Sequence, residues 1–303
     1  MKIRLNPIVK KDMQVAARSM RLSWGLFAYE AVLTLAFLLA MMIIQAESGD
    51  VYGGGNVYSY LVYLFPVLAV AQVCIVALIV PILTASSISG ERERQTLDIM
   101  LTTCMSPFAI VVGKVVSAVL RILFFVAAST PIMALAFVVG GLSWSNLFYF
   151  LLTIILLSVL SGSIGILCSA LCRRSITAVI LSFAFYFIIY ILTYIPVLLR
   201  AALGRGNAGE SMLILLFNPT VFFEEFFMHI MTGESLLGGT GYAFSRKEVG
   251  FLTYHLTTGK TWMFVSAACI LLLSLLFMLA AAWKVNPMHS SSGRKPGKAR
   301  KNK

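Results

Sequence analysis

Charged residues that could bind a partner are concentrated in one short stretch of the chain, between two long apolar runs. Residues 86–114 read SSISGERERQTLDIMLTTCMSPFAIVVGK, and Glu91, Arg92, Glu93, Arg94 and Asp98 lie close together in it. Charges are costly inside a bilayer and are tolerated at its edges. We therefore interpret this stretch as a partner-binding surface on one side of a membrane.

Groups suited to catalysis or metal binding are sparse. The chain has 3 histidines, and none falls in a predicted membrane span. Glu224-Glu225 followed by His229 is similar to the paired-glutamate motif of membrane proteases that process prenylated proteins, but that motif needs arginine at the position of His229. Cys168 and Cys172 are typical of helix packing. No glycine-rich phosphate loop is present. We predict no metal site, no catalytic site and no ATPase site in this chain.

The composition is that of an integral membrane protein. It is 59% hydrophobic and 12% charged, whereas soluble domains carry about 25% charged residues. Several apolar runs reach the roughly 20 residues that span a bilayer as a helix. The predicted fold is all-α with six transmembrane helices, at residues 24–45, 58–85, 108–139, 147–171, 176–199 and 261–283.

Basic residues predict the orientation of these spans. They flank the N-terminal end, the loop after the second span, the turn at Arg173-Arg174 and the C-terminal tail, and they are absent from 46–57 and 140–146. By the positive-inside rule both termini are cytoplasmic, and we expect a multi-pass protein of the cell membrane. The topology accounts for the net charge of +12, and no nucleic-acid-binding motif accompanies that charge.

Three regions follow from this topology. Residues 1–23 form a cytoplasmic segment, interpreted either as an interfacial helix with Pro7 in its first turn or as a basic flank that only orients the first span. Residues 24–284 form the six-span domain, and 285–303 a disordered basic tail near the anionic inner leaflet. In the extracytoplasmic loop 200–260, short re-entrant or interfacial helices are predicted around the turn at Asn218-Pro219, with Thr220 as an N-cap.

The charged stretch itself has helical periodicity from Ser89 to about residue 104. Its apolar stripe and its charged face lie on opposite sides, and Ser106-Pro107 ends the helix. The stripe consists of Leu97, Met100, Leu101 and Cys104, and the charged face of Glu91, Arg94, Gln95 and Asp98. A solvated loop that merely anchors the spans is the alternative interpretation.

The motif ISGERERQTLDIMLTT…SPFAIVVGK resembles the cytoplasmic signature of type-two ATP-binding-cassette (ABC) exporter permeases. The matching residues are Ile88, Glu91, Arg92, Glu93, Thr96, Leu97, Leu101, Thr103, Gly113 and Lys114. The departures are Gln95 for glycine, Asp98 for glutamate, and Cys104-Met105 where Thr-Pro is common. Because glycine is a poor helix former, we expect Gln95 to favour the helix.

This resemblance implies an ATP-driven exporter. The permease would form a homodimer or a heterodimer with a related permease, surrounded by membrane lipids, and would bind cytoplasmic ABC ATPase subunits. ATP and Mg²⁺ would be held by those ATPases, with no cofactor on this chain. The stretch 89–104 would be the coupling helix. Its ATPase-coupling residues would be Glu91, Arg92, Glu93, Arg94, Thr96, Leu97, Asp98 and Leu101.

Further residues lie within the predicted spans. In related exporters the second and fifth spans line the substrate path, where this chain has Gln72, Tyr186, Tyr190 and Tyr194; helix packing is the alternative use of these side chains. Glu30 and Arg121 are intramembrane charges, and we predict that they form an ion pair. The alternative functions are a non-transporting anchor or sensor subunit and an intramembrane enzyme.

Overall fold

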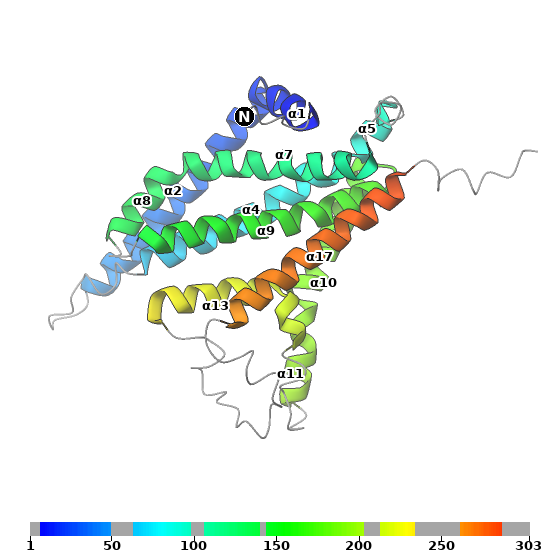
Figure 1. The fold of residues 1–303 in the computed structure, drawn as a ribbon. Coiled ribbons are helices and arrows are strands. Elements are labelled where there is room, and N and C mark those ends of the chain that lie inside the picture. Colours follow the sequence, from blue (N-terminus) through cyan, green and yellow to red (C-terminus); the bar gives the residue numbers. More distant parts are fainter. Residues whose placement is uncertain are drawn as a thin grey trace, which may run out of the picture.

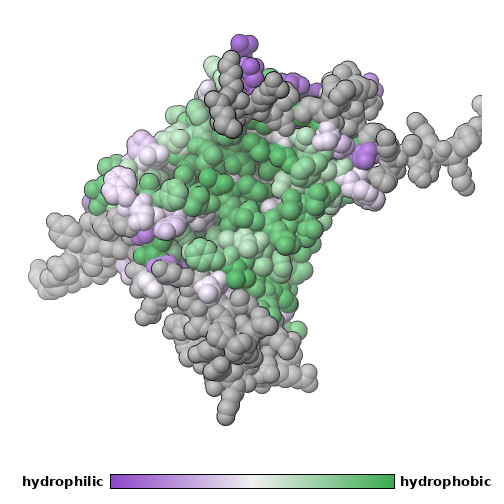
Figure 2. All heavy atoms as spheres, viewed as in Figure 1, coloured by the Kyte–Doolittle hydropathy of each residue, from purple (hydrophilic) through white to green (hydrophobic). Residues whose placement is uncertain are grey.

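The computed structural model describes residues 7–49, 63–97, 106–139, 144–202, 213–233 and 261–286, and every regular element in these ranges is a helix (Figure 1). Six of the helical segments are long and apolar enough to cross a membrane. Their apolar side chains cover the middle of the molecule, with hydrophilic residues at its margins (Figure 2). The prediction of an all-α membrane protein with six transmembrane helices is confirmed.

The helices follow the predicted order, with additional breaks. They are α1 (Pro7–Ala17), α2 (Met20–Gly49), α4 (Leu64–Ala85), α5 (Ser89–Glu93), α7 (Pro107–Ala128), α8 (Thr130–Val139), α9 (Trp144–Leu171), α10 (Ser175–Tyr190), η1 (Leu192–Tyr194), α11 (Ile195–Ala202), η2 (Leu213–Phe217), α13 (Pro219–Thr232) and α17 (Thr261–Val285). The third predicted span is divided at Ser129 and the fifth at Ile191. The predicted tail 285–303 lies almost wholly outside the described residues.

Helix α9 is the central element of the bundle. It packs against α4, α7, α10 and α17 (Figure 1), and most of its length is buried. Ser161, Gly165 and Ser169 recur every fourth residue and are buried along it. Small residues at this spacing let two helix backbones approach closely in lipid, where association depends on packing. The spacing therefore explains why α4 lies so close to α9.

Several helix ends and the charged segment meet at one end of the bundle. Helix α5 lies there, together with the ends of α4, α9 and α17 and the starts of α7 and α10 (Figure 1). Beneath α5, buried side chains from five segments form a separate apolar cluster, which includes Ile88, Leu97, Val111, Ile166 and Val285. We refer to this region as the α5 end.

The N-terminal segment is a distinct helix at the α5 end. Helix α1 begins at Pro7, as predicted, and stops at Ala17, so it does not continue into α2. Ile8 and Val9 are buried against the bundle. Trp24 belongs to α2 and is exposed. The interfacial helix expected within residues 1–23 is therefore shorter than that segment, because the chain turns before α2 begins at Met20.

The segment before the last span contains the two predicted short helices. Helix η2 precedes Asn218, and α13 follows it. The N-cap of α13 is Asn218 and not Thr220, because the Asn218 side chain accepts a hydrogen bond from the Thr220 amide at 2.8 Å. The Asn218 amide nitrogen also donates to Thr193 Oγ1 at 2.7 Å. One buried asparagine thus joins the start of α13 to the break in the fifth span.

The close approach of α4 and α9 gives a direct test of the packing. A Cβ atom at Gly165 would overlap Thr84 Oγ1 and lie 2.9 Å from Thr84 Cβ and 3.2 Å from the Ala85 amide nitrogen. We expect Gly165→Ala to lower the free energy of unfolding by about 1–3 kcal/mol, as overpacking does. The measurement is unfolding of the purified protein in mixed micelles titrated with a denaturing detergent.

Gly162 provides the matched control on the same helix. A Cβ atom there would meet its nearest neighbour, Val115 Cγ1, at 3.6 Å, an ordinary contact. Gly162→Ala should leave the free energy of unfolding unchanged or raise it by up to about 1 kcal/mol, because alanine is favoured over glycine in a helix interior. Equal stability of the two alanine variants would show that α4 and α9 are not in the close contact described.

Candidate functional site

Helix α5 is a single short helix held at its start by α9. The amides of Ile88 and Ser89 both donate to Ser169 Oγ, at 2.9 Å each. The first amides of a helix have no partner within the helix, so a hydroxyl from a neighbour can satisfy them. The Ile88 side chain is fully buried in the cluster beneath. The three charged residues that follow each bind a different helix.

Glu91 binds α7 through Lys114. The Lys114 ammonium lies 2.7 Å from Glu91 Oε1 and 3.3 Å from Asp12 Oδ2, and the three side chains are 7%, 17% and 14% exposed. Ser117 Oγ also donates to Asp12 Oδ2, at 3.2 Å. Two carboxylates sharing one buried ammonium balance its desolvation. This cluster therefore joins α5, α7 and α1.

Arg92 binds the end of α9. Its Nη1 donates to the carbonyl of Cys172 at 2.9 Å, and both terminal nitrogens reach the carbonyl of Ala170, at 3.5 and 3.4 Å. The last carbonyls of a helix lack partners within the helix and carry partial negative charge. A guanidinium satisfies several of them at once because its donors lie in one plane.

Glu93 binds the start of α10. Its carboxylate accepts from the Ser175 amide at 2.8 Å and from the Ser175 hydroxyl at 2.9 Å. Negative charge is stabilising at a helix N-terminus. Glu91, Arg92 and Glu93 therefore form what we call the Glu-Arg-Glu clamp, which ties α5 to α7, α9 and α10. The sequence interpretation treated these side chains as partner-facing, and most of their polar contacts are instead within the chain.

The chain bends sharply directly after the clamp. Arg94 ends α5, and Gln95 has φ 59°, the left-handed conformation. The Thr96 amide donates back to the Glu91 carbonyl at 2.9 Å, and Leu97 is buried in the apolar cluster beneath α5. A continuous helix over 89–104 is therefore wrong, and so is the expectation that Gln95 favours helix. Position 95 is where the related permeases have glycine, and that departure was the available signal for a bend.

Arg94, Gln95 and Thr96 form the exposed apex of this bend. A polar cavity of about 450 Å³ lies beside it, lined by residues that include Lys11 of α1, Ser86 and Ser175. The predicted coupling residues Asp98 and Leu101, with the rest of 98–105, lie outside the described residues. Within the described part of the stretch, residues 86–97, the surface that a partner can touch is centred on the apex and this cavity.

The residues predicted to line the substrate path lie in different parts of the structure. Gln72 is fully buried, and its amide donates to Ser129 Oγ at 3.5 Å, while Tyr29 shares that hydroxyl at 3.3 Å. The rings of Tyr186 and Tyr190 are stacked at 5.2 Å. Tyr194 packs instead with the cluster around Trp262. Tyr194 is separated from Tyr186 and Tyr190 because α10 ends at Tyr190.

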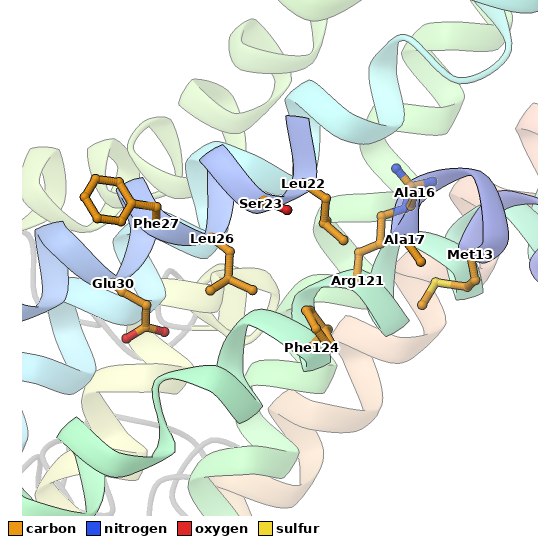
Figure 3. A pocket seen from close by; sticks show the side chains of 10 residues that line it. All are labelled: Met13, Ala16, Ala17, Leu22, Ser23, Leu26, Phe27, Glu30, Arg121 and Phe124. Carbon is orange, nitrogen blue, oxygen red and sulfur yellow. The ribbon is translucent and has the colours of Figure 1, made fainter. Parts of the chain in front are cut away.

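Glu30 and Arg121 line the same cavity, between α1, α2 and α7, but do not form the predicted ion pair. Among the described residues, the ion pairs within 4 Å are the two at Lys114. The Arg121 guanidinium points toward α1, and the Glu30 carboxylate points away from it (Figure 3). Their side chains contribute to one cavity, and α1 contributes Met13, Ala16 and Ala17 to the same lining.

Six membrane-spanning helices with a clamped charged segment at one end define a polytopic helical membrane protein of the transporter type. The chain belongs to the ABC-2 transporter family, because the family model described as ABC-2 family transporter protein matches residues 47–284. Comparison with curated proteins gave no match. The resemblance that the Glu-Arg-Glu motif suggested is confirmed, and the chain is the membrane permease component of a transporter.

The left-handed residue gives a prediction about stability. A residue with a Cβ atom pays about 1–2 kcal/mol in the left-handed conformation, and glycine does not. We expect Gln95→Gly to raise the free energy of unfolding by about 0.5–1 kcal/mol, since glycine's greater freedom in the unfolded chain offsets part of the gain. The change in the free energy of unfolding is measured by titration with a denaturing detergent. Arg94→Gly, at φ −82°, is the control and should not stabilise; a similar gain in both variants would contradict the bend.

The ion cluster gives a second prediction. Lys114→Met leaves two neighbouring carboxylates without their cation, and we expect a loss of about 1–3 kcal/mol, less than for a fully buried pair. Helix α1 should also become more accessible to proteases. Lys284→Met, at an exposed lysine, should change stability by less than about 0.5 kcal/mol. Adding Glu91→Gln to Lys114→Met should restore part of the lost stability. If the losses of the two single variants simply add in the double variant, Glu91 and Lys114 are not paired.

Proposed function

We propose that this chain is the membrane-spanning permease subunit of an ATP-driven exporter, and that separate ABC ATPase subunits bind its α5 end. The ATPases would hold ATP and Mg²⁺, and the permease would act as a dimer with itself or with a related permease. The α5 end would face the cytoplasm of the cell, since the basic residues gather on this side. Family membership and the exposed apex beside a polar cavity support this proposal.

The observation that carries the proposal is the Glu-Arg-Glu clamp. Through it, one short segment holds the start of α7, the end of α9 and the start of α10. A displacement of the apex by an ATPase would therefore move three spanning helices together. Alternating access requires such a two-state change of packed helices, driven by a partner that binds the two states with different affinity.

The division between clamp and apex also determines which residues transmit force and which make contact. Glu91 and Arg92 are bound within the chain, so they act as connectors. Arg94 to Thr96 are exposed and are assigned to the ATPase contact. Charge reversal at Glu91 would break the Lys114 cluster as well as any contact with a partner. Arg94 is therefore the cleaner position for a test.

We expect Arg94→Glu to lower the ATP-hydrolysing activity that co-purifies with the permease by about tenfold or more, the effect of reversing a charge in an interface. The tagged permease is isolated from its native membranes in mild detergent, and ATP hydrolysis is measured per mole of permease. The amount of permease in the membrane fraction should stay unchanged, because Arg94 is exposed.

Lys284→Glu is the matched control, because Lys284 is an exposed basic residue at the same end of the bundle and outside the α5 segment. The ATP-hydrolysing activity that co-purifies with Lys284→Glu should equal that of the wild-type permease. Full activity with Arg94→Glu would place the ATPase contact elsewhere. Activity that co-purifies but drives no transport in vesicles would favour the anchor or sensor function.

A further inference from the structure

A cavity of about 500 Å³ lies under α1, between α2 and α7. Its walls are apolar, with Leu26, Phe27 and Phe124 among them (Figure 3). A volume of this size is within the range of sites that bind small molecules. The cavity is separate from the polar cavity beside α5, and the proposed ATPase contact makes no use of it.

Two opposite charges face this apolar space without being paired to each other. Oε1 of Glu30 and Nε of Arg121 are both buried and without a hydrogen-bond partner. Asp12 interacts with Arg121 electrostatically, but its carboxylate already binds Lys114 and Ser117. A buried polar atom without a hydrogen-bond partner is costly, so this arrangement favours a ligand that supplies both missing partners.

A second apolar hollow continues from the cavity on the outside of α2. It has a volume of about 340 Å³ and is lined by Met20, Ser23, Trp24 and Phe27, and it shares Ser23 and Phe27 with the cavity. The Trp24 and Phe27 side chains are 68% and 66% exposed. The opening of the cavity is therefore bordered by exposed aromatic side chains at the α5 end of α2, which are typical of a membrane interface.

Both charged residues of the cavity lie within helices that are long and apolar enough to span a membrane. Arg121 lies seven residues beyond Lys114 on α7, which is about 10 Å along the helix. Glu30 lies ten residues into α2, about 15 Å from its start. These distances remain within one half of a bilayer core of about 30 Å. Helix α1 covers the site from the side of the α5 end (Figure 3).

We propose that this cavity binds the headgroup of an aminophospholipid of the surrounding bilayer, a lipid with one phosphate and one primary ammonium. The phosphate would pair with Arg121, whose planar guanidinium suits phosphate oxygens. The ammonium would donate to Glu30, which accepts hydrogen bonds that a quaternary ammonium cannot give.

The test is a lipid titration of the full-length permease by native mass spectrometry. Delipidated protein in detergent is titrated with phosphatidylethanolamine, phosphatidylglycerol and phosphatidylcholine that carry identical acyl chains. Phosphatidylethanolamine should bind about tenfold more tightly than either of the others, the effect of one charge-assisted hydrogen bond. Equal binding of all three lipids, or preference for phosphatidylglycerol, would overturn the proposal.

Two isosteric variants separate the two contacts. Glu30→Gln should bring the affinity for phosphatidylethanolamine to within about twofold of that for phosphatidylglycerol, while Arg121→Gln should weaken all three lipids about tenfold. Glu224→Gln and Arg173→Gln, at exposed residues outside the cavity, are the controls and should bind as the wild type does. Wild-type lipid preference in Glu30→Gln would exclude the ammonium contact.

Photocrosslinking locates the site without any substitution. A phosphatidylethanolamine with a photoreactive group near its headgroup is bound to the wild-type protein, irradiated and mapped by peptide mass spectrometry. Crosslinks should fall on α1, α2 or α7 near the cavity. Crosslinks confined to other helices would overturn the assignment even if both variants proved unstable.

Discussion

The termini of helices that meet at one end of a membrane bundle must find partners for amides and carbonyls that the helices cannot satisfy themselves. In this protein Arg92 and Glu93 meet that requirement, and the adjacent Glu91 binds a lysine side chain. Glu91 shares the Lys114 ammonium with Asp12, Arg92 binds the carbonyls at the end of α9, and Glu93 binds the first amide of α10. The positions of α1, α7, α9 and α10 relative to α5 all depend on these contacts.

The clamp works because α9 can lie close to α4. With Gly165 against Thr84 and Ala85, the two backbones approach closely enough for Ser169, one turn further along, to hold the start of α5. A larger residue at position 165 would move the end of α9 and its carbonyls away from Arg92. Packing in the spans and polar contacts at their ends are therefore parts of one arrangement.

The same end of the bundle shows two uses of charge. At Lys114 every charge has an opposite partner, and the cluster is a rigid junction between helices. In the cavity beneath α1, Glu30 and Arg121 face apolar walls and form no ion pair with each other. The physical difference is the distance to a partner. A buried charge that meets its partner within the chain supports the fold, and one that does not is available to a ligand.

The sequence by itself determined the class of protein. Runs of apolar residues of span length define the six helices, since lipid leaves backbone groups no other partners. The cluster of charges around Glu91 and the spacing of its neighbours identified the family, and Pro7 and Asn218-Pro219 marked the starts of α1 and α13. These are local properties, so they can be read within a few helical turns.

Only the tertiary structure decided what each charge does. The partners of Glu91, Arg92 and Glu93 lie between 23 and 82 residues away along the chain. Helical periodicity placed Glu91 on a charged outer face because it contains no information about such distant contacts. The bend at Gln95 likewise overrides a helix-forming residue, because burying Leu97 and closing the Thr96 bond to Glu91 require the chain to turn there. Local pattern sets which segments are helical, and long-range packing sets which of their faces remain free to bind.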